Sequence, residues 1–73
     1  MTFHDFIVRI PFGLVYAVRT AIIRECGITP QTFRNWYHND VPRTHDQEII
    51  NKIAESFRLQ KPFTIKNKQN DGE

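Results

Sequence analysis

The stretch GITPQTFRNW, residues 27–36, decides how this chain folds. Gly27 can adopt the left-handed backbone conformation that closes a helix, and Ile28 just beyond it can pack back across the turn. Thr29 followed by Pro30 is a strong helix start, because the threonine hydroxyl caps a free N–H and proline at the first helical position lacks one. The stretch therefore predicts two helices joined by a tight glycine turn.

The helix that begins at Pro30 has two different faces. Phe33 and Trp36 stand three residues apart on one side, which we expect to lie in the core. Its flanks are polar and carry Gln31, Thr32, Arg34 and Asn35. The run Asn-Asp-Val-Pro at 39–42 is a turn signal, so the predicted helix spans residues 30–38.

Two helices are predicted before this turn. Thr2 with Asp5 three residues later is a helix start signal, and apolar residues then recur at helical spacing: Phe3, Phe6, Ile7 and Ile10. Pro11 and Gly13 break the pattern, so this first helix is predicted to end near Arg9. A second apolar stripe then continues to the glycine turn: Leu14, Val15, Val18, Ala21 and Ile22.

A fourth helix is predicted from Thr44, because Gln47 three residues on completes a Thr-x-x-Gln capping box. Its apolar face consists of Ile49, Ile50, Ile53, Ala54 and Phe57. After Leu59 the helical period vanishes, so we expect a domain over 1–59 and a polar, flexible tail over 60–73, with 63–65 as a candidate edge strand in a dimer. The predicted fold is a small all-α, four-helix domain that contains a helix-turn-helix.

Length and composition set bounds on the class of protein. The chain has 73 residues, 40% hydrophobic and 25% charged, which predicts one globular domain whose core contributes few kcal/mol. Cys26 is the single cysteine, which favours the reducing cytoplasm. The longest uncharged apolar run, 10–18, is about half of the roughly 20 residues that a membrane span needs, so no membrane segment is expected.

The segment 27–36 resembles the lambda-repressor-like (XRE-type) helix-turn-helix family, whose members have a glycine, an aliphatic residue, a small capping residue, a polar stretch and a tryptophan at this spacing. The resemblance covers roughly residues 15–57. It implies that the helix after the turn is a DNA recognition helix and that its inner apolar pair packs on the preceding helix. Two positions depart from the pattern: Ile23 stands where the family prefers alanine, and Tyr37 where it often has an acidic residue.

Carried over by position, the resemblance implies base contacts for Gln31 and Arg34, a base or phosphate contact for Asn35, and backbone contacts for Thr29 and Thr32. The residue chemistry fits, since arginine can donate two bonds to guanine and glutamine or asparagine can pair with adenine. Further phosphate contacts are expected from His38, Arg43, Arg19 and Arg24. The predicted function is sequence-dependent binding of double-stranded DNA, as a transcription regulator acting as a homodimer.

A second interpretation keeps the helical scaffold but uses it as a protein-interaction module, which docks a partner through Phe12, Tyr16 and Tyr37. It is favoured by the small net charge of +2 and by acidic residues near the third helix, Asp40, Asp46 and Glu48. An enzyme is not predicted, because no nucleophile, base and orienting group occur together. No metal site, cofactor or small-molecule substrate is predicted either, since the histidines and the cysteine lack ligand spacing.

Overall fold

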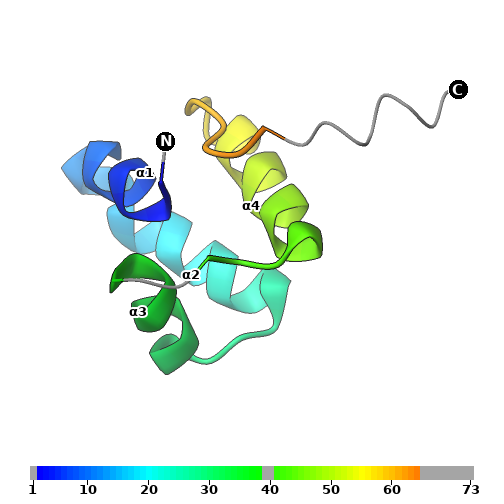
Figure 1. Ribbon diagram of the computed structural model, residues 1–73. Helices are drawn as coiled ribbons and strands as arrows, with labels where there is room; N and C mark the ends of the chain where they lie inside the picture. Colours follow the sequence, from blue (N-terminus) through cyan, green and yellow to red (C-terminus); the bar gives the residue numbers. More distant parts are fainter. Residues whose placement is uncertain (1, 39–40, 65–73) are drawn as a thin grey trace, which may run out of the picture.

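The computed structural model describes residues 2–38 and 41–64, and these residues form four α-helices with a short 3₁₀ turn (Figure 1). The helices are α1 (Phe3–Arg9), α2 (Val15–Cys26), α3 (Pro30–His38) and α4 (Thr44–Ser56), and the 3₁₀ turn η1 spans Phe12–Leu14. No strand occurs within this described part of the chain. The predicted all-α class is therefore confirmed, and so are the predicted bounds of α3 and the predicted end of α1 at Arg9.

Helix α1 is closed at its start by a complete capping box. The Thr2 hydroxyl accepts a hydrogen bond from the Asp5 backbone N–H at 3.0 Å, and the Asp5 carboxylate accepts one from the Thr2 N–H at 3.4 Å. The chain then bends by 110° between α1 and the segment Phe12–Cys26, where Pro11 and Gly13 predicted a break. Among the described residues no single helix has the length and apolar character to cross a membrane, and these two segments meet that test only as a bent pair.

The junction between α2 and α3 has the predicted geometry. Gly27 adopts a left-handed conformation, with φ 67° and ψ 37°, and the N–H groups of Gly27 and Ile28 both donate to the carbonyl of Ile23. Thr29 then caps α3, because its hydroxyl accepts the backbone N–H of Thr32 at 3.1 Å. Ile28 alone lies between the glycine that ends α2 and the threonine that caps α3.

Replacing Gly27 with alanine is expected to lower the free energy of unfolding by about 1 kcal/mol, because alanine pays a steric cost at positive φ. An added Cβ would meet nothing within 4 Å there, so the loss would come from the backbone alone. Gly13→Ala is the matched control, since Gly13 also has open space around it but no positive φ. Urea denaturation measures both variants, and equal midpoints for the two would contradict the prediction.

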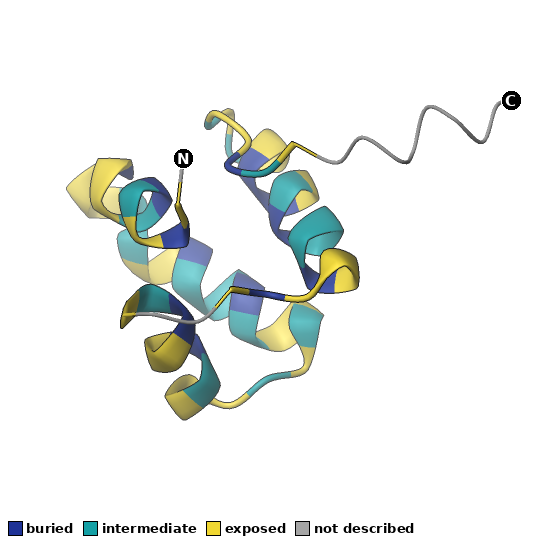
Figure 2. Cartoon of the chain, viewed as in Figure 1, coloured by how far each residue is buried: buried dark blue, intermediate teal, exposed yellow. Residues whose placement is uncertain are grey.

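The core is built from two helix pairs, α2 with α4 and α1 with α3. Figure 2 shows the buried residues on the facing sides of these helices. Between α2 and α4 the fully buried residues are Val18, Ile22, Ile50 and Ala54. Between α1 and α3 the contact is aromatic and is made by Phe3, Phe33 and Trp36. The apolar faces predicted from helical spacing are the faces that the structure buries.

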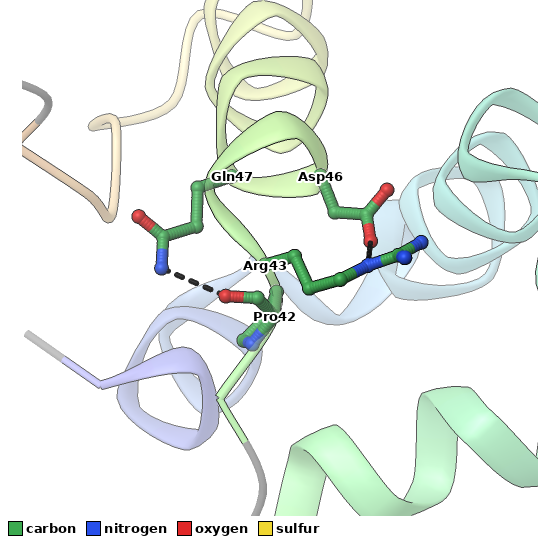
Figure 3. Close-up of polar contacts among 4 residues, drawn as sticks. All are labelled: Pro42, Arg43, Asp46 and Gln47. Carbon is green, nitrogen blue, oxygen red and sulfur yellow. Dashed lines mark hydrogen bonds and ion pairs between the residues drawn. The ribbon is translucent and has the colours of Figure 1, made fainter.

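The start of α4 differs from the prediction, because the capping box of Thr44 and Gln47 is not formed. The capping position is Arg43, with φ −67° and ψ 161°, and its side chain makes no capping hydrogen bond. Thr44 is already the first helical residue, so its hydroxyl is one position too late to cap the helix. Gln47 instead donates from its side-chain Nε2 to the Pro42 carbonyl at 2.8 Å (Figure 3).

The chain stays packed after α4. Arg58 takes a left-handed φ of 62° and Leu59 N–H returns to the Ala54 carbonyl at 2.8 Å. The Asn51 side chain then holds the backbone of Phe63 on both sides, donating to its carbonyl at 2.8 Å and accepting its N–H at 3.1 Å. Contacts with α4 thus extend to Phe63. Phe63 and Thr64 do not form a strand, and the rest of the predicted tail, 65–73, lies outside the described residues.

Candidate nucleic-acid interface

The outer face of α3 carries a polar stripe. Its members are exposed and follow one another at i, i+3, i+4 and i+7, which places them on one side of the helix: Gln31, Arg34, Asn35 and His38. The opposite side holds the two buried aromatic residues, Phe33 and Trp36. Helix α3 is therefore anchored by one face and free on the other, and four of the seven predicted DNA-contacting residues lie together on the free face.

The anchor of α3 is mainly α1 and not the preceding helix. The Phe33 and Trp36 rings both meet Phe3 nearly edge-on, with centroid distances of 5.4 Å and 5.9 Å. This corrects the expectation that the pair packs on the preceding helix. Ile23 on α2 gives a physical reason, because it is half-buried against the core and fills more space than the alanine that would allow close helix approach.

The side chain of Arg19 on α2 also contacts this anchor. Its guanidinium carbon lies 5.5 Å from the centre of the Phe33 ring. Arg19 and Arg34 also line one surface hollow of about 360 Å³, together with Pro30, Tyr37 and His38. The sequence predicted Arg19 as a phosphate contact, and the structure adds a packing role that its position in the sequence did not indicate.

The backbone N–H groups in the first turn of α3 are partly satisfied by hydrogen bonds to the chain itself. The Thr29 hydroxyl caps Thr32 and lies 3.2 Å from the Thr32 hydroxyl, which is half-buried. Pro30 has no N–H, so Gln31 carries the one amide of the first three helical positions for which the described residues provide no acceptor. The predicted phosphate site at this helix end would thus use a single amide with the positive end of the helix dipole.

The last turn of α3 rests on His4, a residue that the sequence analysis did not single out. The His4 Nδ1 atom lies 3.3 Å from the Tyr37 carbonyl oxygen, and the two rings are in contact, tilted by 43° with centroids 4.4 Å apart. The two residues are 33 positions apart, so no local pattern in the sequence predicts their contact. This contact fixes the C-terminal end of α3 against α1 and leaves His38 exposed beside it.

The remaining predicted arginines have acidic partners elsewhere. Arg24 pairs with Glu25 at 3.4 Å, an exposed pair of small energetic value. Arg43 precedes α4, and its Nε lies 3.5 Å from a carboxylate oxygen of Asp46, which is 2% exposed (Figure 3). Arg43 is therefore not part of the stripe on α3, although its guanidinium keeps donors on the solvent side.

Burial beside Asp46 changes the chemistry of the single cysteine. Burial first, and then the negative charges of Asp46 and Glu25, raise the pKa of the Cys26 thiol from its ordinary 9.0 to about 11. The folded chain therefore keeps a proton that the unfolded chain loses, and this thiol's contribution to stability falls as the pH rises from about 9 to about 11.

Alkylation of Cys26 at pH 8 is expected to be at least about tenfold slower in the folded protein than in urea, because the thiolate is the reactive form. The rate of iodoacetamide modification, followed by mass spectrometry, measures this difference. Equal rates would show that the Cys26 thiol ionises as freely in the folded chain as in the unfolded one.

Searches with this chain against family models, curated proteins and solved structures found no match. The resemblance in residues 27–36 therefore remains a prediction from the residues themselves. What the structure defines is a class: a small all-α domain in which a short helix, held by aromatic residues, exposes a stripe of amide, guanidinium and imidazole groups.

Proposed function

We propose that this chain binds double-stranded DNA by inserting α3 into the major groove, and that it regulates transcription. The observation that carries the proposal is the two-sided character of α3, with buried rings on one face and an exposed polar stripe on the other. A groove-reading helix needs this arrangement, because one face must be held by the domain while the other reaches base edges. The short turn between α2 and α3 agrees with the helix-turn-helix that the sequence predicts.

The stripe offers the donors and acceptors that base reading requires. Arg34 presents a fork of donors that matches O6 and N7 of guanine. Gln31 and Asn35 are already linked, since the Gln31 Nε2 donates to the Asn35 Oδ1 at 3.2 Å. This bond holds the two amides side by side, so either could pair with N6 and N7 of adenine when the other releases it.

The charge around α3 supports contact with a polyanion. Helix α3 contains no acidic residue, and Arg19 and Arg34 line the same hollow beside it. We expect both arginines to neutralise phosphates beside the groove, while the overall net charge is only +2. Binding through so few charges is expected to be weak without base contacts, and each phosphate neutralised adds only about one unit to the slope of log K against log salt.

Replacing Arg34 with alanine is expected to weaken binding to a selected DNA site by about 1–3 kcal/mol, because a bidentate base contact is lost. The fold should survive, since Arg34 is exposed. Lys52→Ala is the matched control, because it removes one exposed positive charge from α4 instead. Fluorescence anisotropy on a site obtained by selection from random duplexes measures both. If Arg34→Ala behaves like Lys52→Ala, Arg34 has no role in base reading.

The protein-interaction interpretation is favoured by one observation, the exposure of Phe12 and Tyr16. Its third expected contact, Tyr37, is half-buried and in contact with the His4 ring, and is less accessible to a partner. Binding of random duplex DNA at low salt separates the two functions. Affinity that is present near 50 mM salt and lost as salt rises supports DNA binding, and no binding even at low salt supports the interaction module.

A further inference from the structure

Three large apolar side chains remain exposed at one corner of the domain. Phe12 is 94% exposed, Tyr16 75% and Val8 56%, and the three come from η1, the first turn of α2 and the end of α1. Exposed residues cover this bend between α1 and α2 (Figure 2). Phe12 and Tyr16 are four residues apart across η1 and α2, and Val8 precedes Phe12 by four residues on the other side of the 110° bend. These three residues are called the corner patch below.

The exposed apolar area of the corner patch is larger than that of single hydrophobic residues scattered over a surface. A full aromatic side chain presents about 150–250 Å², so the three residues together expose roughly 400–500 Å². This is the size of patch that usually marks an interaction site on a small protein. A domain this short also gains little stability from its own core, which makes burial of further apolar area against another chain favourable.

We propose that the corner patch is the surface through which two copies of this chain form a homodimer. The buried area favours a second copy as the partner, because two such patches facing one another bury roughly 800–1,000 Å². The flanking Arg9 and Pro11 bring the total to the lower limit of specific interfaces. The patch itself has no charge, so two copies meet without apposing like charges at its centre. Residues 65–73 are a poor alternative occupant, because Ile65 is their one apolar residue.

The position of the corner patch suits the proposed function, on which this inference rests. The corner patch lies at the first turn of α2, and the glycine turn that leads to α3 lies at the C-terminal end of α2. A 12-residue helix is about 18 Å long, so the patch and this turn are about that far apart. The four residues of the polar stripe on α3 are not members of the corner patch, so pairing of two copies does not require them. A two-fold dimer would present two such stripes, and a single nine-residue helix contacts too few bases for useful selectivity.

Sedimentation equilibrium of the full chain without DNA, between 1 µM and 1 mM, tests the proposal. The average mass is expected to rise from the monomer towards twice its value over this range. Phe12→Asp should raise the dimer Kd at least about 30-fold, because both copies lose the central aromatic residue of the interface. Val41→Asp is the matched control, since Val41 is a 73% exposed apolar residue outside the corner patch, and it should leave the Kd unchanged.

Tyr16→Asp serves as a second variant, and far-UV circular dichroism shows whether each variant is folded. A wild-type chain that stays monomeric to 1 mM overturns the proposal, and so does a dimer that Phe12→Asp and Tyr16→Asp leave intact. A monomer that binds phosphatidylcholine–phosphatidylglycerol vesicles through Phe12 would instead assign the corner patch to a lipid surface. A dimer that binds no DNA would contradict the proposed function alone, and a monomer that binds DNA would contradict this inference alone.

Discussion

Phe3→Ala is expected to leave most of the protein unfolded at 25 °C. Phe3 is 3% exposed, and its ring contacts those of Phe6, Phe33 and Trp36. Removing a buried phenylalanine side chain costs about 3–5 kcal/mol, which is about the whole stability that a domain of this size obtains from its core. The substitution removes the contact between α1 and α3, so the helix that carries the polar stripe is no longer held against α1.

Phe12→Ala is the matched control, because it deletes the same side chain from a position that is 94% exposed. Measured below the concentration at which the chain dimerises, it should change the free energy of unfolding by no more than about 0.5 kcal/mol. Fluorescence of Trp36, the single tryptophan, and far-UV circular dichroism in urea follow both variants. A Phe3→Ala protein with the wild-type urea midpoint would show that α1 does not hold α3.

The helices could be predicted from the sequence because the signals that set their ends are local. Thr2 with Asp5, Gly27, and Thr29 with Pro30 each act on backbone groups within three or four residues, and each made the contact that its pattern predicts. The capping box at Thr44 failed for an equally local reason. Arg43 is the residue in extended conformation, so the helix begins one position before the box requires.

The partners of each helix could not be predicted in the same way. Phe3 with Trp36, His4 with Tyr37 and Asn51 with Phe63 are pairs separated by at least 12 residues, and nothing in the local sequence of one member indicates the other. Helical spacing shows which face is buried but not what buries it. The resemblance implied packing of α3 on the preceding helix, whereas the structure packs it mainly on α1.

In the candidate site, too, some features could be predicted from the local sequence and others depend on the tertiary structure. The stripe of Gln31, Arg34, Asn35 and His38 follows from helical period once the buried face of α3 is known. Whether a predicted arginine is free depends on the tertiary structure: Arg43 lies against a buried carboxylate and Arg19 against an aromatic ring. Charge counted along the sequence cannot distinguish these two from Arg34.

Ile50→Ala is expected to lower the free energy of unfolding by about 2–5 kcal/mol. Ile50 is fully buried on α4 and belongs to the packing between α4 and α2, the pair of helices with the most extensive contact. The expected cost has two parts, the lost transfer of three carbon atoms from water and the cavity that a rigid core leaves open. Ile50→Val removes one methylene only and should cost about 0.5–1.5 kcal/mol, which gives a graded control at the same position.

Urea unfolding of Ile50→Ala, followed by two probes, also tests whether the two helix pairs form one cooperative unit. Trp36 fluorescence reports on α3, whereas circular dichroism at 222 nm reports on all the helices. A single domain this small should unfold in one transition. Both probes should therefore shift to the same lower midpoint, although Ile50 belongs to the α2–α4 pair and Trp36 to the α1–α3 pair. If Trp36 kept the wild-type midpoint, α1 and α3 would be stable without α2 and α4. The polar stripe would then owe its position to the contacts that Phe3 and His4 of α1 make with α3.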